Sequence, residues 1–243
     1  MITIEICANS IASALSAQGG GAQRIELCES LETGGLTPSY GTLMGVKECL
    51  RIPVHVLIRP RNGDYVYDNQ LIDVMMRDIE LVKKIGFQGV VIGILDRHAQ
   101  LDTDRFRLLL EVAAGLDITF HRAFDVAADP MKLAGQLADL GVDRILTSGQ
   151  AATALKGVKL LAELVRNCGH NIAIMAGGGI QSKNILNIIG LTGVKECHLS
   201  AKRTITGQLA DHLTAEFNPG EFDRLETDET EVRKIVSLTG NRS

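Results

Sequence analysis

Short runs rich in β-branched residues alternate with longer amphipathic stretches along the chain, and this alternation constrains the fold more than any other feature of the sequence. Runs of about 5–6 residues followed by amphipathic stretches of about 10–15 residues are typical of βα units that build a parallel sheet. Strands are predicted at residues 2–7, 24–28, 53–58, 89–94, 117–122, 143–148, 171–176 and 195–200. Helices are predicted at residues 9–18, 39–50, 69–85, 103–114, 129–140, 151–167, 181–190 and 229–238.

Eight such units fit into 243 residues without a linker or a shift in composition. Closed (β/α)8 barrels of about 250 residues fold as one unit. We therefore predict an α/β protein, a single-domain (β/α)8 TIM barrel that covers residues 1–243. An open, doubly wound sheet is the alternative, and it would usually begin with a Gly-rich turn after its first strand. This chain has Cys7-Ala8-Asn9-Ser10 at that point.

Three longer segments interrupt the alternation, and each of them follows a predicted strand. They are residues 29–38, 59–68 and 201–228, after the second, third and eighth strands. In a parallel barrel, such segments gather at the carboxyl ends of the strands, where barrel enzymes have their working site. We expect the working site of this chain on the same face.

Side chains alternate between the two sides of a strand, so the strand sequences also predict which residues face the barrel axis. The helix-facing set must be apolar, which leaves the other set in the lumen. The residues predicted to face inward are Thr3, Glu5, Cys7, Glu26, Cys28, His55, Leu57, Arg59, Thr119, His121, Glu196, His198 and Ser200. A lumen built for stability alone holds mainly Val, Ile and Leu. Because buried charges without partners are costly, this polar set indicates ion pairing, metal binding or ligand binding.

The position of a residue along its strand predicts the depth of its side chain in the barrel. Glu26, His55 and Glu196 are expected near the bottom, where a structural network of ion pairs and a functional role are both open. Residues nearer the mouth are the better candidates for function, namely Cys7, Cys28, Arg59, His121 and Ser200.

A glycine triplet after the seventh predicted strand is the main candidate for anion binding. Glycines let backbone N–H groups approach an oxyanion, and the loops after strands seven and eight often hold phosphate in such barrels. Ser200 could complete the cradle, and Arg59 with Arg61 could add guanidinium donors. A tight turn is the alternative interpretation of the triplet. The candidate anion-binding residues are Arg61, Gly177, Gly178, Gly179 and Ser200.

His121, at the top of the fifth predicted strand, is a candidate for acid–base chemistry. Imidazole titrates near neutral pH, and the nearby carboxylate of Asp125 could orient the ring. A histidine hydrogen-bonded to a neighbouring loop carbonyl is the alternative. No lysine lies at a predicted strand end, which argues against a Schiff-base mechanism. The candidate catalytic residues are Glu5, Glu26, Arg59, His121, Asp125 and His198.

Cys7 and Cys28 are predicted at similar depths on neighbouring strands, about 5 Å apart along the backbone. Two thiolates at that spacing could hold a soft ion such as Cu(I), although two core cysteines would produce the same pattern. The chain has five cysteines without CxxC spacing, which favours reduced thiols. No organic cofactor is implied.

Composition argues against several classes of partner. The formal net charge is −4, so a nucleic-acid partner is not expected. The longest apolar runs are far shorter than the ~20 residues that span a bilayer, and the amino terminus lacks the basic region of a signal peptide. We therefore expect a cytoplasmic protein without a membrane partner.

Several segments together resemble the copper homeostasis protein CutC family along nearly the whole chain. They are Glu5-Ile6-Cys7, Arg24-Ile25-Glu26-Leu27-Cys28, Gly34-Gly35-Leu36-Thr37-Pro38-Ser39, Ile58-Arg59-Pro60-Arg61 with Gly63-Asp64, Thr119-Phe120-His121-Arg122-Ala123-Phe124-Asp125, Leu146-Thr147-Ser148-Gly149-Gln150, Met175-Ala176-Gly177-Gly178-Gly179, and His198 with Ser200. The resemblance implies a cytoplasmic (β/α)8 barrel that forms homo-oligomers, dimers or tetramers, and contributes to copper tolerance by binding Cu(I). It also implies cysteine ligands near the barrel mouth, and Cys7 and Cys28 match its motifs. Where some relatives have a second cysteine after the first, this chain has Ala8.

Two functions are therefore open, and whether the chain is an enzyme is open with them. One is a cytosolic protein of copper homeostasis that binds Cu(I) through Cys7 and Cys28. The other is a barrel enzyme that carries out acid–base chemistry on a small phosphorylated or carboxylated metabolite at the carboxyl-end face. The expected partners are a copper ion, a small anionic metabolite, or both.

Overall fold

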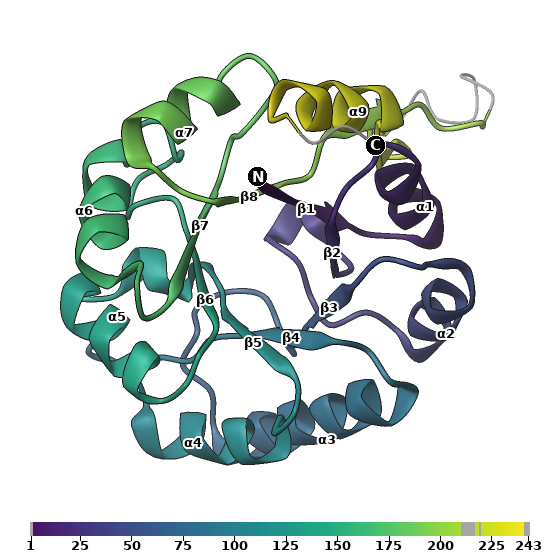
Figure 1. Cartoon of the computed structure of the whole chain (residues 1–243). Helices are drawn as coiled ribbons and strands as arrows, with labels where there is room; N and C mark the ends of the chain where they lie inside the picture. Colours follow the sequence, from purple (N-terminus) through teal and green to yellow (C-terminus); the bar gives the residue numbers. More distant parts are fainter. Residues whose placement is uncertain (1, 210–216, 219, 241–243) are drawn as a thin grey trace.

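The fold is a closed barrel of eight parallel strands surrounded by helices, which confirms the predicted (β/α)8 architecture. The computed structural model describes residues 2–209, 217–218 and 220–240. Each strand pairs with its neighbours in chain order, and β1 pairs with β8 to close the barrel (Figure 1). The strands are β1 (Thr3–Ala8), β2 (Arg24–Leu27), β3 (Val54–Leu57), β4 (Gly89–Ile92), β5 (Asp117–Phe120), β6 (Arg144–Thr147), β7 (Ala173–Gly177) and β8 (Glu196–Leu199).

Helices follow the strands and cover the outside of the barrel (Figure 1). They are α1 (Ile11–Gly19), α2 (Tyr40–Cys49), α3 (Asn69–Ile85), α4 (Thr103–Val112), α5 (Pro130–Asp139), α6 (Val158–Cys168), α7 (Ile185–Thr192) and α9 (Glu229–Leu238). Several begin at a residue whose side chain accepts a backbone N–H of the first turn, as an N-cap does. Ser10, Asp68 and Asp129 cap α1, α3 and α5 in this way. Pro130 takes the first position of α5, where no N–H is needed.

Two helices begin later than the sequence predicts, α6 by seven residues and α7 by four. The segment before α6 forms turns instead, because two stretches of backbone meet there. A Cβ on Gly157 would lie 1.9 Å from the carbonyl oxygen of Ser148, so only glycine allows this approach. Helical periodicity in the sequence could not reveal that contact. Short 3₁₀ helices, η1 (Leu31–Thr33) and η2 (Arg122–Val126), are further elements that the sequence analysis does not predict.

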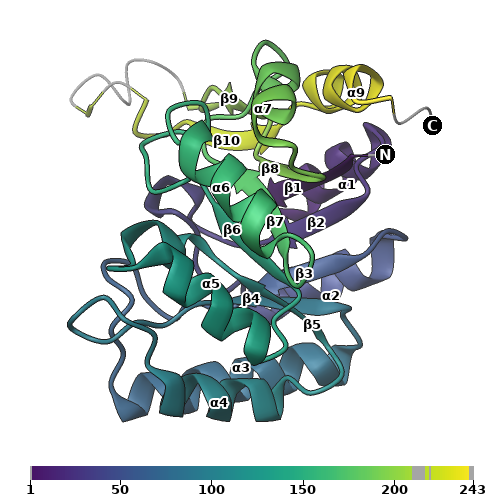
Figure 2. The same ribbon diagram turned by 60° about the vertical axis from the view of Figure 1, so that its left-hand side comes forward.

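The segment after β8, expected as a loop, contains a two-stranded antiparallel hairpin in its described part. Its strands are β9 (Lys202–Ile205) and β10 (Arg224–Thr227). Two side chains, one just after β1 and one on α1, form hydrogen bonds with the backbone of β10. The Ser13 hydroxyl accepts the N–H of Thr227 at 3.1 Å, and the Asn9 amide donates to the Leu225 carbonyl at 3.0 Å. Figure 2 shows the hairpin and α9 at one end of the barrel, near α1.

Apolar residues on the outer side of the strands pack against the helices and form the main core. Ile4 and Ile6 of β1 are fully buried in this core, while Glu5 between them is buried among the polar residues of the lumen. This alternation confirms the predicted strand phase. Among the described residues, no helix has both the length and the apolar character needed to cross a membrane.

Candidate functional site

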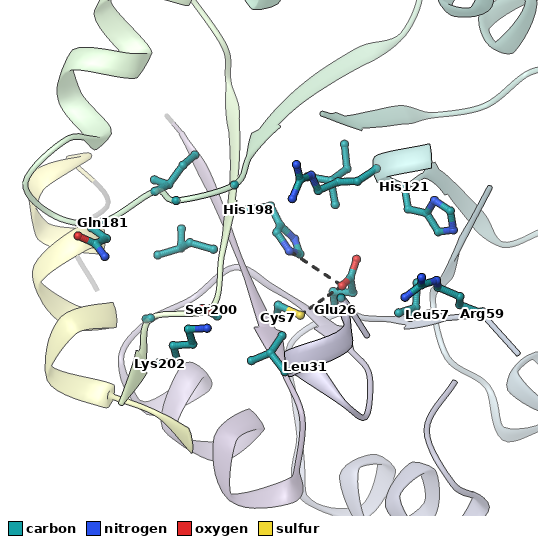
Figure 3. Close-up of a pocket in the computed structure, with 18 of the residues that line it drawn as sticks. Cys7, Glu26, Leu31, Leu57, Arg59, His121, Gln181, His198, Ser200 and Lys202 are labelled. Carbon is teal, nitrogen blue, oxygen red and sulfur yellow. Dashed lines mark hydrogen bonds and ion pairs between the residues drawn. The ribbon is translucent and has the colours of Figure 1, made fainter. Parts of the chain in front are cut away.

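A cavity of about 630 Å³ opens at the carboxyl ends of the strands. Small-molecule sites typically measure about 300–1,000 Å³, so this cavity has room for a metabolite and far more room than a metal ion needs. Side chains from several strands and from the loop after β7 line it (Figure 3). The polar residues of its wall include Cys7, Glu26, Arg59, Tyr65, His121, Arg122, Gln181, His198, Ser200 and Lys202, with the backbone of Gly178 and Gly179.

Below the cavity, the lumen holds a network of buried ion pairs. Arg24 donates from Nε to Glu5 and from Nη2 to Glu196. Arg144 Nε lies 3.1 Å from Glu196 Oε2, and its Nη1 donates to the Thr119 hydroxyl at 3.1 Å. Burial acts to lower the pKa of Arg24, but the charges of Glu5 and Glu196 outweigh burial and raise it. Glu5, predicted as catalytic, is therefore part of a network whose charges compensate one another.

His55 and Glu196 lie at the bottom of the lumen, as predicted. Burial lowers the pKa of His55 to about 3, so its imidazole is neutral. Its Nε2 lies 3.5 Å from a carboxylate oxygen of Asp117, but a neutral ring forms no ion pair with it. The His55 ring fits because the neighbouring residue of β4 is Gly89. A Cβ on Gly89 would lie 2.7 Å from Cδ2 of the His55 ring.

Cys7, Glu26 and His198 form the floor of the cavity. Glu26 lines the cavity together with Cys7, its register partner on β1, whereas His55 does not, so the predicted position of Glu26 at the barrel bottom is wrong. The Cys7 thiol donates to Glu26 Oε1 at 3.3 Å, and His198 Nε2 lies 4.0 Å from the same oxygen. His198 Nδ1 is 2.8 Å from Glu5 Oε1, which connects the floor to the network below it.

Burial and neighbouring charges shift the pKa values of the floor. Burial raises the pKa of Glu26. Burial acts to lower the pKa of His198, but the carboxylates of Glu26 and Glu5 outweigh it and raise that pKa. Burial likewise acts to raise the pKa of Glu5, yet Arg24 and His198 hold it below its ordinary value. The floor thus pairs a carboxyl group and an imidazole whose pKa values are both raised.

Cys28 contacts Cys7 but does not line the cavity. The two Sγ atoms are 3.5 Å apart, and Cys28 is fully buried against Leu57. The hydrogen bond with Cys28 and burial raise the pKa of the Cys7 thiol. Cys7, Glu26 and His198 each offer one ligand atom within 4.8 Å of the others, which is a mixed donor set that the sequence analysis did not anticipate.

Arg59 lines the wall of the cavity, and its hydrogen bonds link the loop after β2 to the loop after β3. Its Nη1 donates to the carbonyls of Thr33 and Gly35 at 3.0 and 2.9 Å, and its Nη2 donates to Gly63 at 3.0 Å. The guanidinium lies over the ring of Tyr65, 5.3 Å from the ring centroid. Arg59 is buried, and its Nε has no hydrogen-bond partner among the described residues. The hydroxyl of Tyr67, which is near Arg59 and does not line the cavity, also has no hydrogen-bond partner among the described residues.

His121 lies close to Arg59 in the same wall. Its Nδ1 accepts the N–H of Ala123 at 3.1 Å, so the neutral ring carries its proton on Nε2. Burial and the positive charge of Arg59 lower the pKa of His121 to about 3. Nε2 has no partner among the described residues. The ring fits because a Cβ on Gly93, just after β4, would lie 2.4 Å from Nδ1.

The loop after β7 presents backbone to the cavity, as predicted for an anion cradle. Gly178 and Gly179 line the cavity and have φ angles of +97° and +70°, which glycine adopts without strain. Within the described part of the chain, the N–H groups of Gly178, Gly179 and Ile180 make no hydrogen bond. Three successive peptide donors are thus available to an oxyanion.

Two cations and a hydroxyl line the same cavity, namely Arg122, Lys202 and Ser200. The guanidinium carbon of Arg122 is 3.7 Å from the position that a Cβ on Gly178 would take. Its charge therefore lies at the Gly178 loop. Ser200 was predicted here, and its position in the cavity wall agrees with that prediction.

Two acidic residues at the same cavity, Asp228 and Glu231, are bonded to backbone N–H groups. Asp228 accepts the N–H of Thr230 at 2.9 Å, and Glu231 accepts the N–H of Ser182 at 2.9 Å. The Ser182 N–H, just before α7, is therefore satisfied by the protein. The preceding loop, from Gly178 to Ile180, has N–H groups that make no hydrogen bond within the described part of the chain.

Arg61 and Gly177, both predicted to bind anions, have other roles. The Arg61 guanidinium donates to Asp64 Oδ1 at 2.7 Å and to carbonyls of its own loop, and it does not line the cavity. Gly177 is the last residue of β7, and a Cβ there would lie 2.4 Å from Leu146. Its lack of a side chain serves packing within the barrel.

Asp125, predicted to orient His121, holds two loops together instead. One carboxylate oxygen accepts from Arg122 Nε at 2.7 Å, and the other accepts the Thr147 hydroxyl at 2.5 Å and the Ser148 N–H at 2.9 Å. Among the described contacts, His121 is oriented by the backbone rather than by this carboxylate. The alternative given for His121, a bond to a loop carbonyl, is not found among the described contacts either, because the ring accepts a backbone N–H and its Nε2 has no partner.

Four charged residues of the lumen and cavity are absent from the sequence predictions: Arg24, Arg144, Arg122 and Lys202. Arg24 precedes Glu26 by two residues and shares its inward side, so strand phase could have identified it. The same argument applies to Arg144 on β6. Arg122 and Lys202 follow strand ends, where no periodicity predicts the direction of a side chain.

Comparison with known proteins identifies close relatives. The model of the CutC family matches residues 2–203. A protein of Xanthomonas campestris pv. campestris (strain 8004), named family protein CutC, is 47% identical over 236 residues, which cover 97% of this chain and 98% of that protein. A protein of the same name from Photobacterium profundum is 42% identical over 238 residues, 98% of this chain and 97% of that protein.

A solved structure has the same fold. The crystal structure of a candidate copper homeostasis protein CutC from Streptococcus agalactiae is 35% identical, with a TM-score of 0.79, and covers 82% of this chain and 99% of that one. The family model, the relatives and this structure agree with the resemblance seen in the sequence segments. The chain therefore belongs to the CutC family.

Proposed function

We propose that the cavity binds a small anionic metabolite and exchanges protons with it, so that the chain is a barrel enzyme. One observation carries this proposal: three buried residues of the cavity wall each have a polar atom without a partner among the described residues. These atoms are Glu26 Oε2, Arg59 Nε and His121 Nε2, and each residue is only 5% exposed. An unsatisfied buried polar group costs about 1–3 kcal/mol, so a ligand that satisfies all three atoms would be favoured.

The anionic end of such a metabolite has a place to bind. The free N–H groups of the loop from Gly178 to Ile180 and the charge of Arg122 face one region of the cavity. Peptide donors with a guanidinium group suit a phosphate or a carboxylate. The ammonium group of Lys202, which lines the same cavity, adds a further positive charge.

The proton-transfer end is the floor. Glu26 and His198 are the titratable pair, and the hydrogen bond of Glu5 to Nδ1 leaves His198 Nε2 directed toward Glu26. Figure 3 shows Glu26 with Cys7 and His198 on one side and with Arg59 and His121 on the other. Glu26 is therefore placed to act on a group bound between the two walls.

Ligand screening tests this proposal. Sugar phosphates, phosphorylated carboxylic acids and their unphosphorylated counterparts would be compared by thermal shift and calorimetry on the full chain. We expect stabilisation by anionic members only, weaker binding in Lys202→Met, and unchanged binding in Lys195→Met, at the other end of β8. A panel without any stabilising compound, together with tight Cu(I) binding, would contradict the enzyme and favour the second function.

That second function is Cu(I) binding in copper homeostasis, and the pair of sulfur atoms 3.5 Å apart favours it. Cu(I) is bound by soft thiolates in sites of low coordination number, so the two cysteines fit the ion as cargo. Cys7 and Cys28 would hold it, with Glu26 and His198 near Cys7. Because the pKa of Cys7 is raised, Cu(I) must displace its proton, and the affinity should increase with pH.

Competition with a Cu(I) chelator tests the copper site. The double variant Cys7→Ser/Cys28→Ser should lose Cu(I) binding, and the matched double variant Cys49→Ser/Cys168→Ser should retain it. Equal affinity in the two double variants would place Cu(I) elsewhere. The same titration with Zn²⁺ measures whether the mixed donor set of Cys7, Glu26 and His198 selects copper.

We also infer cytoplasmic placement and a homo-oligomer, a dimer or a tetramer, and the family resemblance supports both. Light scattering of the purified chain measures the oligomeric state directly. A monomer at micromolar concentration would contradict the inference on assembly without affecting the cavity.

A further inference from the structure

We propose that the cavity activates a carbonyl group of a phosphorylated substrate and removes a proton from the neighbouring carbon, so that the reaction passes through an enediolate. This inference rests on the proposed function and names its substrate class. The substrate would be a phosphorylated aldehyde or ketone with a hydroxyl group next to the carbonyl. Three groups carry the argument: two unpartnered N–H donors, one unpartnered carboxylate oxygen, and the anion cradle.

The two N–H donors lie in one wall of the cavity. They are Arg59 Nε and His121 Nε2, both in buried residues and both without a partner among the described residues. Tyr65 connects them, because the Arg59 guanidinium lies 5.3 Å from its ring centroid and the His121 ring centroid lies 5.0 Å from it. Two fixed donors on one side of a cavity can bind one oxygen atom and hold it as negative charge develops.

The chemical nature of the donors favours an oxyanion over a neutral water molecule. His121 is a neutral imidazole because burial and Arg59 lower its pKa to about 3, so it donates a hydrogen bond without giving up its proton. Arg59 supplies a permanent positive charge next to it. Both groups are already fixed, Arg59 by three carbonyls and His121 by the Ala123 N–H. Fixed donors require no rearrangement as the charge forms.

Glu26 is the candidate base, and Figure 3 shows it between Cys7 and His198 on one side and Arg59 and His121 on the other. Glu26 Oε1 accepts from the Cys7 thiol, and Oε2 is left without a partner among the described residues. His198, 4.0 Å from Oε1, can share the proton once Glu26 has taken it.

The proton transfer balances within these groups. The C–H bond next to the carbonyl breaks, and its proton forms an O–H bond with Glu26. The electron pair of that bond becomes the new C=C bond, and the carbonyl π electrons move to the oxygen held by Arg59 and His121. Return of the proton to the other carbon, with the hydroxyl proton transferred between the two oxygens, regenerates the carboxylate and gives an isomer of the substrate.

A Schiff-base route to similar products does not fit this arrangement. Among the residues lining the cavity in the described part of the chain, Lys202 is the single lysine. It is exposed and follows β8, whereas the unpartnered atoms are buried. The carbonyl is therefore activated by hydrogen bonds rather than by an amine.

Binding of an enediolate mimic tests the inference. Calorimetry on the full chain would compare 2-phosphoglycolohydroxamate, which imitates the enediolate, with glycerol 3-phosphate, which has the phosphate but no carbonyl. We expect the hydroxamate to bind about 100-fold more tightly, the lower end of the preference for analogues of a transition state. His121→Phe should lose this preference while it still binds glycerol 3-phosphate, and His121→Gln, which retains an N–H donor, should keep part of it.

Proton exchange gives a second readout. In D2O, dihydroxyacetone phosphate and ribose 5-phosphate should lose the NMR signal of the hydrogen next to the carbonyl faster with wild-type protein than with Glu26→Gln. We expect a loss of at least about 100-fold in that rate, the scale of general base catalysis. Glu48→Gln, an exposed carboxylate on α2, serves as the matched control and should exchange at the wild-type rate.

The outcomes separate this inference from the proposed function. If the wider panel contains a stabilising anion but neither phosphorylated compound binds, this inference fails and the proposed function stands. If no compound of the panel binds, both fail. If glycerol 3-phosphate binds but the hydroxamate binds no more tightly, the anion site stands and carbonyl activation is contradicted. Tight hydroxamate binding that persists unchanged in His121→Phe would also contradict it, since the donor pair would then have no role.

Discussion

The lower and the upper halves of the barrel lumen both bury charged side chains, but these charged groups differ in their partners. In the lower half, Arg24 is paired with both Glu5 and Glu196, while the neutral His55 has no hydrogen-bond partner at either ring nitrogen among the described residues. In the upper half, Glu26 and Arg59 are as deeply buried, yet each has an atom without a partner among the described residues. Burial of charge alone therefore does not identify a functional site. Among the charged groups, the difference in pairing separates the network that supports the barrel from the wall to which we assign a ligand.

The largest expected effect concerns the lower half. Arg24→Met would leave Glu5 and Glu196 buried without their shared partner, and we expect a loss of about 3–5 kcal/mol in the free energy of unfolding. Urea denaturation followed by circular dichroism measures it. Arg233→Met, which breaks the exposed pair with Glu229, is the matched control and should cost about 0–1 kcal/mol. Equal effects of the two substitutions would remove the structural role of the lower network.

The pH dependence of stability gives the next largest effect and involves both halves. His55 and His121 have folded-state pKa values lowered to about 3, so the unfolded chain binds more protons than the folded chain below about pH 6.5. Each histidine should therefore make the protein lose about 1.4 kcal/mol of stability per pH unit as the pH falls through that window. Glutamine at either position should reduce the slope by that amount.

Denaturant titrations between pH 7 and 4 check this dependence. His170→Gln replaces an exposed histidine and should leave the slope unchanged. A wild-type slope that His55→Gln does not alter would mean that this imidazole is charged in the folded protein.

A smaller effect distinguishes Glu26 from the carboxylates beneath it. Because burial raises the pKa of Glu26, an uncharged amide should be tolerated, and Glu26→Gln should change stability by less than about 1 kcal/mol in either direction. Glu5→Gln should destabilise the protein more, since Glu5 is held ionised by Arg24. Thermal unfolding of the two variants side by side checks the order. The reverse order would place Glu26 in the supporting network.

The smallest effect is expected at Arg61. Its guanidinium is bonded within an exposed loop and lies outside the cavity wall, so Arg61→Met should cost about 0–1 kcal/mol and leave anion binding unchanged. Calorimetry with glycerol 3-phosphate measures the second part. A large loss of affinity would restore Arg61 to the anion site.

The barrel and the inward side of its strands could be predicted from sequence because both follow from periodicity. Apolar residues at every second position of β1 place Glu5 and Cys7 toward the axis without reference to other strands. The glycines after β7 and Ser200 could be placed at the mouth for the same reason, since strand ends define that face.

Whether each polar group has a hydrogen-bond partner could not be predicted, because that depends on the register between neighbouring strands and on the conformation of the loops. Glu26 was expected too deep, since depth was taken along each strand separately and the register with Cys7 was unknown. Asp125 lies near His121 in sequence, but the loop after β6 bends to meet it and takes its hydrogen bonds. Arg59 was correctly expected in the lumen, yet its bonds to three loop carbonyls appear only in three dimensions.

The most direct test of the difference between the two halves is an NMR titration of ¹⁵N-labelled full-length protein with 2-phosphoglycolohydroxamate, which has both the phosphate and the group that imitates the enediolate. The Nε–H signals of Arg59 and Arg24 report on the upper and the lower half of the same lumen. The account predicts saturable shifts at Arg59 Nε–H and at the backbone N–H groups of Gly178 and Gly179, with no shift at Arg24 Nε–H. Shifts of equal size at both arginines, or none at Arg59 when the hydroxamate binds, would contradict it.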